Sequence, residues 1–518
     1  MNKKKITNIA IITIVALITL IPMFISDYTN GHDTKFHVAT IISYTESIKS
    51  GYLIPKISPS ITSFGYGTGL FYPPLAHLIS SYINLIIDNP LLSIKITYFI
   101  SLLLSGLTMY FLSKKISKSD SIGLVSSVIY MLYSYHICNI YIRDALSEVM
   151  LFSFLPLIIN GLYELFVMDD KNKFFKLFIA GYSLSILSHT VLSLYFTLII
   201  IVFLIINYKK TFKNIIPILT SSFFILLITL FYWLPLLEQK IMGSYRVFKD
   251  GVMVQGTWGN GLSIFTYFNL LVNLKDNSVK YYIDVLTLIM LVVSLINFKK
   301  YNTKFYKYIL IFGIVSMILS SKLFPWDTFP KCFRIMQFPW RFVTFVSISV
   351  SLISPLCMNL FKDQKVMSYV ICGILVLLSQ ALLHSFSNEV IDIDNLDFKS
   401  GEGFQHEYFP NKLYDNYDHY ENKSIDDIEI ISDSIPKLEF KVNTNSVTTI
   451  ELPRIYYYGY TLKDENGKKY KLSESNYGFI EANLSSGVYT LDYTESNLYV
   501  IISLISVLVY GVIVWKKK

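Results

Sequence analysis

Long apolar runs separated by short lysine-bearing breaks dominate the chain. A membrane-spanning helix needs about 20 mostly apolar residues, and twelve runs are candidates. They lie at 6–26, 92–112, 121–137, 145–166, 177–189, 190–207, 215–236, 282–298, 307–322, 341–361, 366–385 and 498–515. The pattern predicts a polytopic α-helical membrane protein with about 12 transmembrane helices. We expect the first helix to be retained, because no small-x-small cleavage site follows it.

The lysines set the expected orientation. Cytoplasmic loops of membrane proteins carry an excess of lysine and arginine. With the N-terminal lysines placed inside, every later cluster also falls inside; these clusters lie at 114–118, 171–176, 209–213, 299–307, 362–365 and 516–518. We therefore expect a multi-pass protein of the cell membrane with both termini cytoplasmic.

The requirement that all lysine clusters lie on the inner side also decides whether two ambiguous stretches cross the membrane. A full crossing by the apolar residues 70–87 would turn the next lysine cluster outward, so we expect an interfacial or re-entrant segment there. Residues 177–207 lie between two inside clusters and must cross twice. A tight reversal near Ser188, His189 and Thr190 would leave His189 recessed below the outer surface.

The expected outer segments are 27–91, 138–144, 237–281, 323–340 and 386–497. The last one opens polar and acidic, then alternates in runs such as KLEFKV and GVYTLDYT, with an Asn466-Gly467 pair suited to a hairpin turn. This predicts a small extracytoplasmic β-sandwich over 425–495. The predicted domains are therefore a transmembrane domain (1–385), an extracytoplasmic domain (386–497, β-rich from about 425), and a final helix with a basic tail (498–518).

Composition supports the membrane class and excludes two others. Of 518 residues, 53% are hydrophobic and only 16% charged, which is too apolar for a soluble protein of this length. The net charge of +8 does not indicate a nucleic-acid partner, because the lysines flank helices. The sequence has five arginines and 40 lysines, and this bias indicates a bacterium with an AT-rich genome.

All five arginines fall on the predicted outer side: Arg143, Arg246, Arg334, Arg341 and Arg454. The planar guanidinium suits bidentate phosphate binding, so an outer cavity lined by some of them would hold the phosphate of a lipid carrier. The alternative is that they cap helices or pair with nearby acids. This alternative is favoured for Arg454, and it is open for Arg143, Arg334 and Arg341 beside helix mouths.

The stretch GHDTKFH places Asp33 just beyond the first helix. A carboxylate there is suited to deprotonate an acceptor hydroxyl or to help hold a divalent cation, assisted by His32 and His37. The alternative is a solvated loop aspartate. The spacing of the three residues also fits a transition-metal site, although no further clear ligand lies nearby.

The stretch NIYIRDALSE adds Arg143, Asp144 and Glu148. Asp144 and Glu148 are four residues apart, so on a helix they would share a face. Glu148 opens an apolar run, where a carboxylate is costly unless it meets a partner or a watery cavity, which marks a candidate functional residue. The alternative is an internal salt bridge with an arginine.

The aromatic loop 324–342 is suited to line a lipid-tail or sugar groove, with Arg334 and Arg341 meeting phosphate; the alternative is an interfacial aromatic belt. The sequence contains no P-loop, GxGxxG, HExxH or GxSxG motif in a supporting context, so no nucleotide cofactor is expected.

Taken together, these motifs resemble the YfhO-type bacterial membrane proteins, which are similar to the GT-C fold of polyprenyl-phosphate-sugar-dependent glycosyltransferases. The resemblance rests on GHDTKFH, the YPPL segment (Tyr72 to Leu75), Arg143 to Glu148, the SHT hairpin, FPWRF (Phe338 to Phe342) and the C-terminal β region. Some relatives carry a label that refers to 6-pyruvoyl-tetrahydropterin synthase, but nothing in this sequence supports pterin chemistry.

The resemblance implies transfer of a sugar from undecaprenyl phosphate, or a similar carrier, to a cell-surface glycopolymer such as teichoic acid. It implies Asp33 as the general base and Glu148 as its catalytic partner. The substrate and phosphate contacts would be His32, His37, Arg143, Asp144, His189, Arg334 and Arg341. Thr34 follows the GHD stretch where an acidic pair would stand, so metal dependence stays open.

Two other classes compete with the transferase. A flippase or transporter of lipid-linked sugars would use the same arginines without a general base. Charge within several helices and a repeat with two-fold symmetry would favour this class. A non-catalytic envelope assembly factor would use the outer β domain to recruit polymer. Fold analogy alone does not separate these classes.

Overall fold

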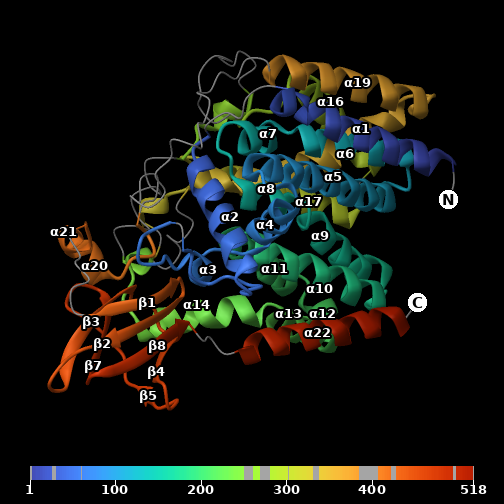
Figure 1. Cartoon of the computed structure of the whole chain (residues 1–518). Helices are drawn as coiled ribbons and strands as arrows, with labels where there is room; N and C mark the ends of the chain where they lie inside the picture. The colour runs from blue at the N-terminus through green and yellow to red at the C-terminus, as the bar shows by residue number, and fades with distance from the viewer. Residues whose placement is uncertain are drawn as a thin grey trace.

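The computed structural model describes residues 3–25, 31–59, 61–249, 261–268, 281–301, 303–328, 330, 338–383, 406–421, 428–493 and 497–516. A helical body and a smaller antiparallel β region make up this part of the chain (Figure 1). The predicted fold class, a polytopic helical protein with β structure near the C-terminus, is confirmed.

The helices account for every predicted apolar run. Their bounds are α1 (Lys3–Ile25), α2 (Thr34–Lys49), α3 (Thr68–Phe71), α4 (Leu75–Ile87), α5 (Pro90–Ser117), α6 (Asp120–Leu132), α7 (Ser134–Tyr141), α8 (Leu146–Phe152), α9 (Leu155–Tyr163), α10 (Lys171–Ser188), α11 (Thr190–Ile206), α12 (Tyr208–Lys213), α13 (Ile215–Ile228), α14 (Leu230–Met242), α16 (Val285–Ile296), α17 (Lys304–Ser320), α18 (Val343–Ile353), α19 (Gln364–Leu383), α20 (Asn411–Asp415), α21 (Tyr417–Glu421) and α22 (Asn497–Lys516).

Several of these helices are suited to cross a bilayer. Among the described residues, five are long and apolar enough by themselves, and seven if each of two bent pairs is one span. The bent pairs are α6 with α7, at 41°, and α13 with α14, at 74°. Shorter apolar helices add α4, α11, α16 and part of α19.

A short helix and a helix break fall where the sequence predicts them. The 13 residues of α4 extend only about 20 Å at 1.5 Å per residue, less than the roughly 30 Å of a hydrocarbon core. This length is compatible with an interfacial or re-entrant segment. The chain also breaks at His189, whose backbone is extended between α10 and α11 and whose Nδ1 accepts from Leu192 N at 3.2 Å.

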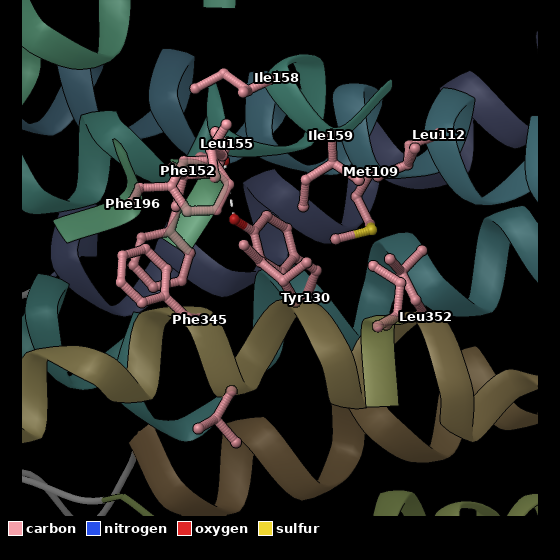
Figure 2. Close-up of a cluster of buried hydrophobic side chains, with 14 of the residues drawn as sticks. Met109, Leu112, Tyr130, Phe152, Leu155, Ile158, Ile159, Phe196, Phe345 and Leu352 are labelled. Carbon is pink, nitrogen blue, oxygen red and sulfur yellow. Dashed lines mark hydrogen bonds between the residues drawn. The ribbon is translucent and has the colours of Figure 1, made fainter. Parts of the chain in front are cut away.

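Aromatic side chains fill the core of the helical body. The Phe152 ring lies 5.4 Å from the Tyr130 ring and Phe345 stacks on Phe196 at 5.3 Å, and Figure 2 shows Met109 on the other side of Tyr130. The Tyr130 hydroxyl donates to the carbonyl of Phe152 at 3.0 Å, so the one polar atom of this ring has a partner where water is absent. The core thereby ties α6, α8 and α18 together.

The β region is a sandwich of two antiparallel sheets within residues 428–493. One sheet has the order β1-β2-β8-β4-β5 and the other β3-β7-β6. The strands are β1 (Glu429–Ser434), β2 (Lys437–Val442), β3 (Thr448–Ile455), β4 (Tyr460–Asp464), β5 (Lys469–Tyr470), β6 (Ser473–Glu474), β7 (Phe479–Leu484) and β8 (Gly487–Tyr493). The predicted turn at Asn466-Gly467 joins β4 to β5, with Gly467 at φ 78°.

The sandwich packs directly on the helical body, at the end away from the two chain termini (Figure 1). Tyr245 stacks on Tyr457 of the sandwich with ring centroids 5.7 Å apart, and Phe71 stacks at 5.0 Å on Tyr408, which belongs to the segment before the sandwich. Gln239 Nε2 donates to the carbonyl of Tyr458 at 2.6 Å. The sandwich is thus held by its own aromatic interface as well as by the final helix.

Lys56 ties the first outer loop to α14. Its side chain is buried, and its Nζ donates to the carbonyl of Phe231 at 2.7 Å. In an α-helix that carbonyl would accept from residue 235, but Pro235 has no N–H. Lys56 therefore supplies the hydrogen bond that the proline removes.

We expect Lys56→Met to lower the free energy of unfolding by about 1–3 kcal/mol, because it leaves the partly buried carbonyl of Phe231 without a donor. Unfolding of the full chain in detergent measures this loss. Lys56→Met combined with Pro235→Ala should recover part of it, because alanine at this position restores the helical N–H. Equal stability of the single and double variants would show that the Phe231 carbonyl is not the source of the effect.

Candidate functional site

The chain leaves the helical path between α7 and α8, and this break presents the charged residues of the site. Asp144 takes a left-handed backbone conformation with φ of 54°. Arg143 N donates back to the carbonyl of Cys138 at 2.9 Å, which closes the turn. α8 then restarts at Leu146, so the two sides of the break face each other across a short distance in sequence.

The prediction that Asp144 and Glu148 share one helix face is wrong. Asp144 lies before α8 and in a non-helical conformation, so the four-residue spacing has no helical meaning there. The Tyr98 hydroxyl of α5 donates to the Asp144 carboxylate. Asp144 therefore anchors the break to α5, while Glu148 serves a separate set of partners.

Glu148 is buried at the start of an apolar span and has two close partners. Its Oε2 accepts from Arg143 at 2.8 Å, and its Oε1 accepts from the Tyr135 hydroxyl at 2.6 Å. Arg143 also donates to Asn139 Oδ1 at 2.8 Å. A buried carboxylate is tolerated only when it is paired and hydrogen-bonded, and this network meets both conditions.

A second arginine reaches the same carboxylate from the 3-10 turn Pro339–Phe342. Arg341 Nε lies 3.8 Å from Glu148 Oε2, and its guanidinium lies over the Phe338 ring, 5.2 Å from the centroid. Thr344 Oγ1 is 3.5 Å from Glu148 Oε1. Glu148 thus holds two guanidinium groups beside each other, and its single negative charge balances only one of them.

The loop between α1 and α2 is fixed onto the break by backbone hydrogen bonds. His32 N donates to the carbonyl of Ile142 at 3.1 Å, and Asp33 N donates to that of Arg143 at 2.9 Å. Gly31 is required at this contact, because a Cβ there would lie 2.7 Å from the Cβ of Asp144. The sequence motifs GHD and RD are therefore neighbours in space.

Asp33 is half-buried and stands at the N-cap position of α2 without a capping hydrogen bond from its side chain. Burial raises the pKa of Asp33 above its usual value, against the opposing charges of Arg143 and Arg341. A carboxylate that is not used for capping and has a raised pKa is suited to accept a proton.

The three predicted histidines occupy different positions. His32 is exposed. His37 is buried and shares a hydrogen bond with His77, with 2.8 Å between Nδ1 and Nε2, and burial lowers the pKa of His37. His189 is half-buried and lies within electrostatic reach of Arg341 and Glu148. His189 is therefore placed at the cluster, whereas His37 is directed to α4.

The remaining arginines are separate from the cluster or outside the described residues. Arg246 stacks on the Tyr414 ring, 3.6 Å from its centroid. Arg454 is buried in the sandwich and pairs with Asp433, which agrees with the ion-pair interpretation of this residue. Arg334 lies outside the described residues.

Two residues that sequence reasoning did not single out also face the site. Tyr72 belongs to the YPPL segment, and burial raises the pKa of its hydroxyl beside Ser147 and Asp33. Burial likewise raises the pKa of Glu407, with Arg341 and Asp33 acting on its carboxyl. Glu407 comes from the C-terminal outer segment, and only tertiary packing brings it here. The YPPL motif was a signal for Tyr72; Glu407 had none.

The described residues contain no group of three or more His, Cys, Asp or Glu side chains that could hold a metal ion. What they do contain is two adjacent guanidinium groups for an anion and a half-buried carboxylate with a raised pKa. Anion binding and proton abstraction are the two chemical capacities of this arrangement.

An apolar cavity of about 410 Å³ lies next to the cluster. Its wall includes Phe342, the residue that follows Arg341, together with Tyr195, Phe196, Phe312 and Trp326. The side chains come mainly from α11 and α17, within the apolar part of the helical body. The cavity is suited to a hydrocarbon chain and adjoins the guanidinium groups through the turn Pro339–Phe342.

Comparison with known proteins yields distant relatives. The chain is 26% identical over 330 residues to an uncharacterized protein of Lactococcus lactis subsp. cremoris, a match that covers 61% of this chain and 54% of that protein. The chain therefore spans about half the length of this relative.

Two solved structures are similar at low identity. One is ArnT from Cupriavidus metallidurans, bound to undecaprenyl phosphate, with a TM-score of 0.47, 10% identity, and coverage of 73% of this chain and 64% of that chain. The other is the oligosaccharyltransferase AglB from Archaeoglobus fulgidus, in complex with an inhibitory peptide and a dolichol-phosphate, with a TM-score of 0.43, 12% identity, and coverage of 82% and 59%. Scores at this level say nothing of the activity of this chain.

A family model gives the assignment. The model described as "6-pyruvoyl-tetrahydropterin synthase related domain; membrane protein" matches residues 70–387. This range includes Arg143, Glu148, His189 and Arg341, and it covers more than half of the chain. The chain therefore belongs to the family of 6-pyruvoyl-tetrahydropterin synthase related membrane proteins.

Proposed function

We propose that this protein is a membrane glycosyltransferase that moves a sugar from a polyprenyl-phosphate carrier to a hydroxyl of a cell-surface glycopolymer. The observation that carries the proposal is the placement of Asp33 beside Arg143 and Arg341, with the loop fixed on the break by the 2.9 Å bond from Asp33 N to the Arg143 carbonyl. A proton acceptor and an anion-binding pair thus adjoin each other.

The donor would be a lipid-linked sugar of the undecaprenyl phosphate type. Its phosphate would lie against the guanidinium groups that Glu148 holds together, because planar guanidinium groups bind phosphate oxygens in pairs. Its isoprenoid chain would occupy the apolar cavity that begins at Phe342. One short turn thus serves both the charged and the apolar part of the donor.

In the reaction, Asp33 takes the proton from the acceptor hydroxyl as that oxygen bonds to the anomeric carbon of the sugar. The bond between this carbon and the phosphate oxygen breaks, and the lipid phosphate leaves with the bonding electron pair. Arg143 and Arg341 stabilise the charge that develops on the leaving phosphate. Glu148 positions the two arginines, and His189 lies beside Glu148 and Arg341. Asp144 holds the break in place through its hydrogen bond with Tyr98.

The reaction would take place on the outer face of the membrane, with both termini cytoplasmic and a polymer such as teichoic acid as acceptor. A lipid-linked donor suits this face because it carries both the sugar and its leaving group across the membrane. The β-sandwich lies at the end of the helical body opposite the chain termini (Figure 1), which supports this orientation.

Asp33→Asn tests the base. We expect the transfer rate to fall roughly 10²- to 10⁴-fold, the usual contribution of a general base. In cells with matched membrane levels, the polymer should lose a sugar while the polyprenyl-phosphate sugar accumulates. Asp88→Asn is the control, because it makes the same chemical change at an exposed carboxylate. If both pools stay normal in Asp33→Asn but change when the protein is deleted, the transporter or assembly function is favoured instead.

The raised pKa of Asp33 predicts an acid limb in the pH profile. Transfer needs the ionised carboxylate, so the rate should fall as the pH decreases through the raised pKa, above the value of about 3.9 for an ordinary aspartate. Arg341→Gln removes a charge that lowers this pKa, so the limb of the residual activity should move to higher pH. The pH dependence of transfer in proteoliposomes measures both. A limb that is unmoved in Arg341→Gln would contradict the assignment.

Glu148→Gln tests the positioning role. The variant keeps the shape of the side chain but leaves two guanidinium groups without a counter-charge, which should lower the free energy of unfolding by about 3–5 kcal/mol. Tyr135→Phe, which removes one hydrogen bond to the same carboxylate, should cost less, about 1.5–3 kcal/mol. Unfolding in detergent compares them. An equal loss in both variants would argue against Glu148 as the shared anchor.

A further inference from the structure

Four aromatic rings form a continuous wall from Arg341 to Glu148. Phe338 stacks on Trp340 with centroids 4.4 Å apart, Trp340 lies 6.3 Å from Tyr281, and Tyr281 stacks on Tyr135 at 5.7 Å. Phe338, Trp340 and Tyr281 are only half-buried, so their rings keep surface available to a ligand. The proposed reaction leaves this wall without a task.

One hydrogen-bond donor of the wall, and one on a residue beside Arg143, have no partner among the described residues. Trp340 Nε1 is buried and unpaired, and so is Nδ2 of Asn139. The Asn139 amide is oriented by its Oδ1, which accepts from Arg143 at 2.8 Å. Buried donors are rarely left without an acceptor, so these two indicate a ligand that supplies acceptor oxygens.

We infer that this aromatic wall is the subsite for the sugar of the donor lipid. The inference rests on the proposed function and names the part of the donor that this wall recognises. A pyranose ring would lay its C–H face on the aromatic wall, and its hydroxyl oxygens would accept from Asn139 Nδ2 and, at the edge of the indole, from Trp340 Nε1. Aromatic rings bind apolar faces by area and dispersion, and the two donors fix the orientation.

The order of chemistry along Phe338 to Phe342 matches the order of parts in a lipid-linked sugar. Phe342 faces the apolar cavity, Arg341 contributes the anion-binding charge, and Trp340 and Phe338 form the aromatic face. A polyprenyl phosphate sugar has the same sequence of chain, phosphate and sugar. The isoprenoid chain fits the apolar cavity and the phosphate fits the guanidinium groups. The uncharged, hydroxyl-bearing sugar is the part left for the wall.

The test measures binding of two probes to the full chain in lipid nanodiscs. The first probe is decaprenyl phosphate, and the second is decaprenyl phosphate carrying glucose, galactose or N-acetylglucosamine, each used to displace labelled decaprenyl phosphate. We expect the wild type to bind at least one of the sugar-carrying lipids about tenfold more tightly than the plain lipid, the combined effect of ring contact and two hydrogen bonds.

Trp340→Leu should reduce this ratio to near one while the affinity for decaprenyl phosphate is kept, which also shows that the variant is folded. Trp340→Phe retains the ring but not the N–H, so its ratio should be intermediate. Trp515→Leu, at an exposed position of α22, is the control and should match the wild type.

Three results separate the possible failures. A wild-type ratio in both Trp340 variants would overturn the sugar subsite while leaving the glycosyltransferase proposal intact. Equal affinity of the wild type for the plain lipid and for every sugar-carrying lipid would also overturn the subsite. Failure of the wild type to bind any of these lipids would overturn the proposed function itself, and the subsite with it.

Discussion

A single buried carboxylate organises the charged cluster of this protein. Glu148 accepts from Arg143 and Tyr135 and attracts Arg341, so it joins the break after α7, the start of α8 and the turn Pro339–Phe342. In a low-dielectric interior none of these charges is tolerable alone. Their mutual compensation therefore holds together segments that lie far apart in the sequence.

The consequences of this anchor extend outward. The break that carries Arg143 also offers the carbonyl groups on which His32 and Asp33 are fixed, and the turn that carries Arg341 also carries Trp340 and Phe342. Glu148 thus fixes the relative positions of the proposed base, the anion site, the chain cavity and the sugar wall. Such an arrangement keeps the reacting groups in register without requiring a rigid outer loop.

The sequence predicts the helices well because a bilayer imposes a length and an apolar composition on every span. It also predicts the sandwich, because one face of each strand is buried and side chains alternate. It fails at Asp144, where a left-handed residue interrupts the helix that the spacing assumed. The contribution of Glu407 to the site was not predicted, because only tertiary packing brings this residue to the cluster from a distant segment.

The aromatic seam between the sandwich and the first outer loop affects how genetic experiments are interpreted. Tyr408 stacks on Phe71, and the neighbouring Glu407 acts on Asp33 and Arg341. Removing residues 406–493, the sandwich together with the segment before it, would therefore also take Glu407 away from the charged cluster. A null phenotype after such a truncation could therefore follow from a disturbed charged cluster as readily as from loss of a surface that binds the polymer. Point changes on strands far from the cluster are the better test of polymer recruitment.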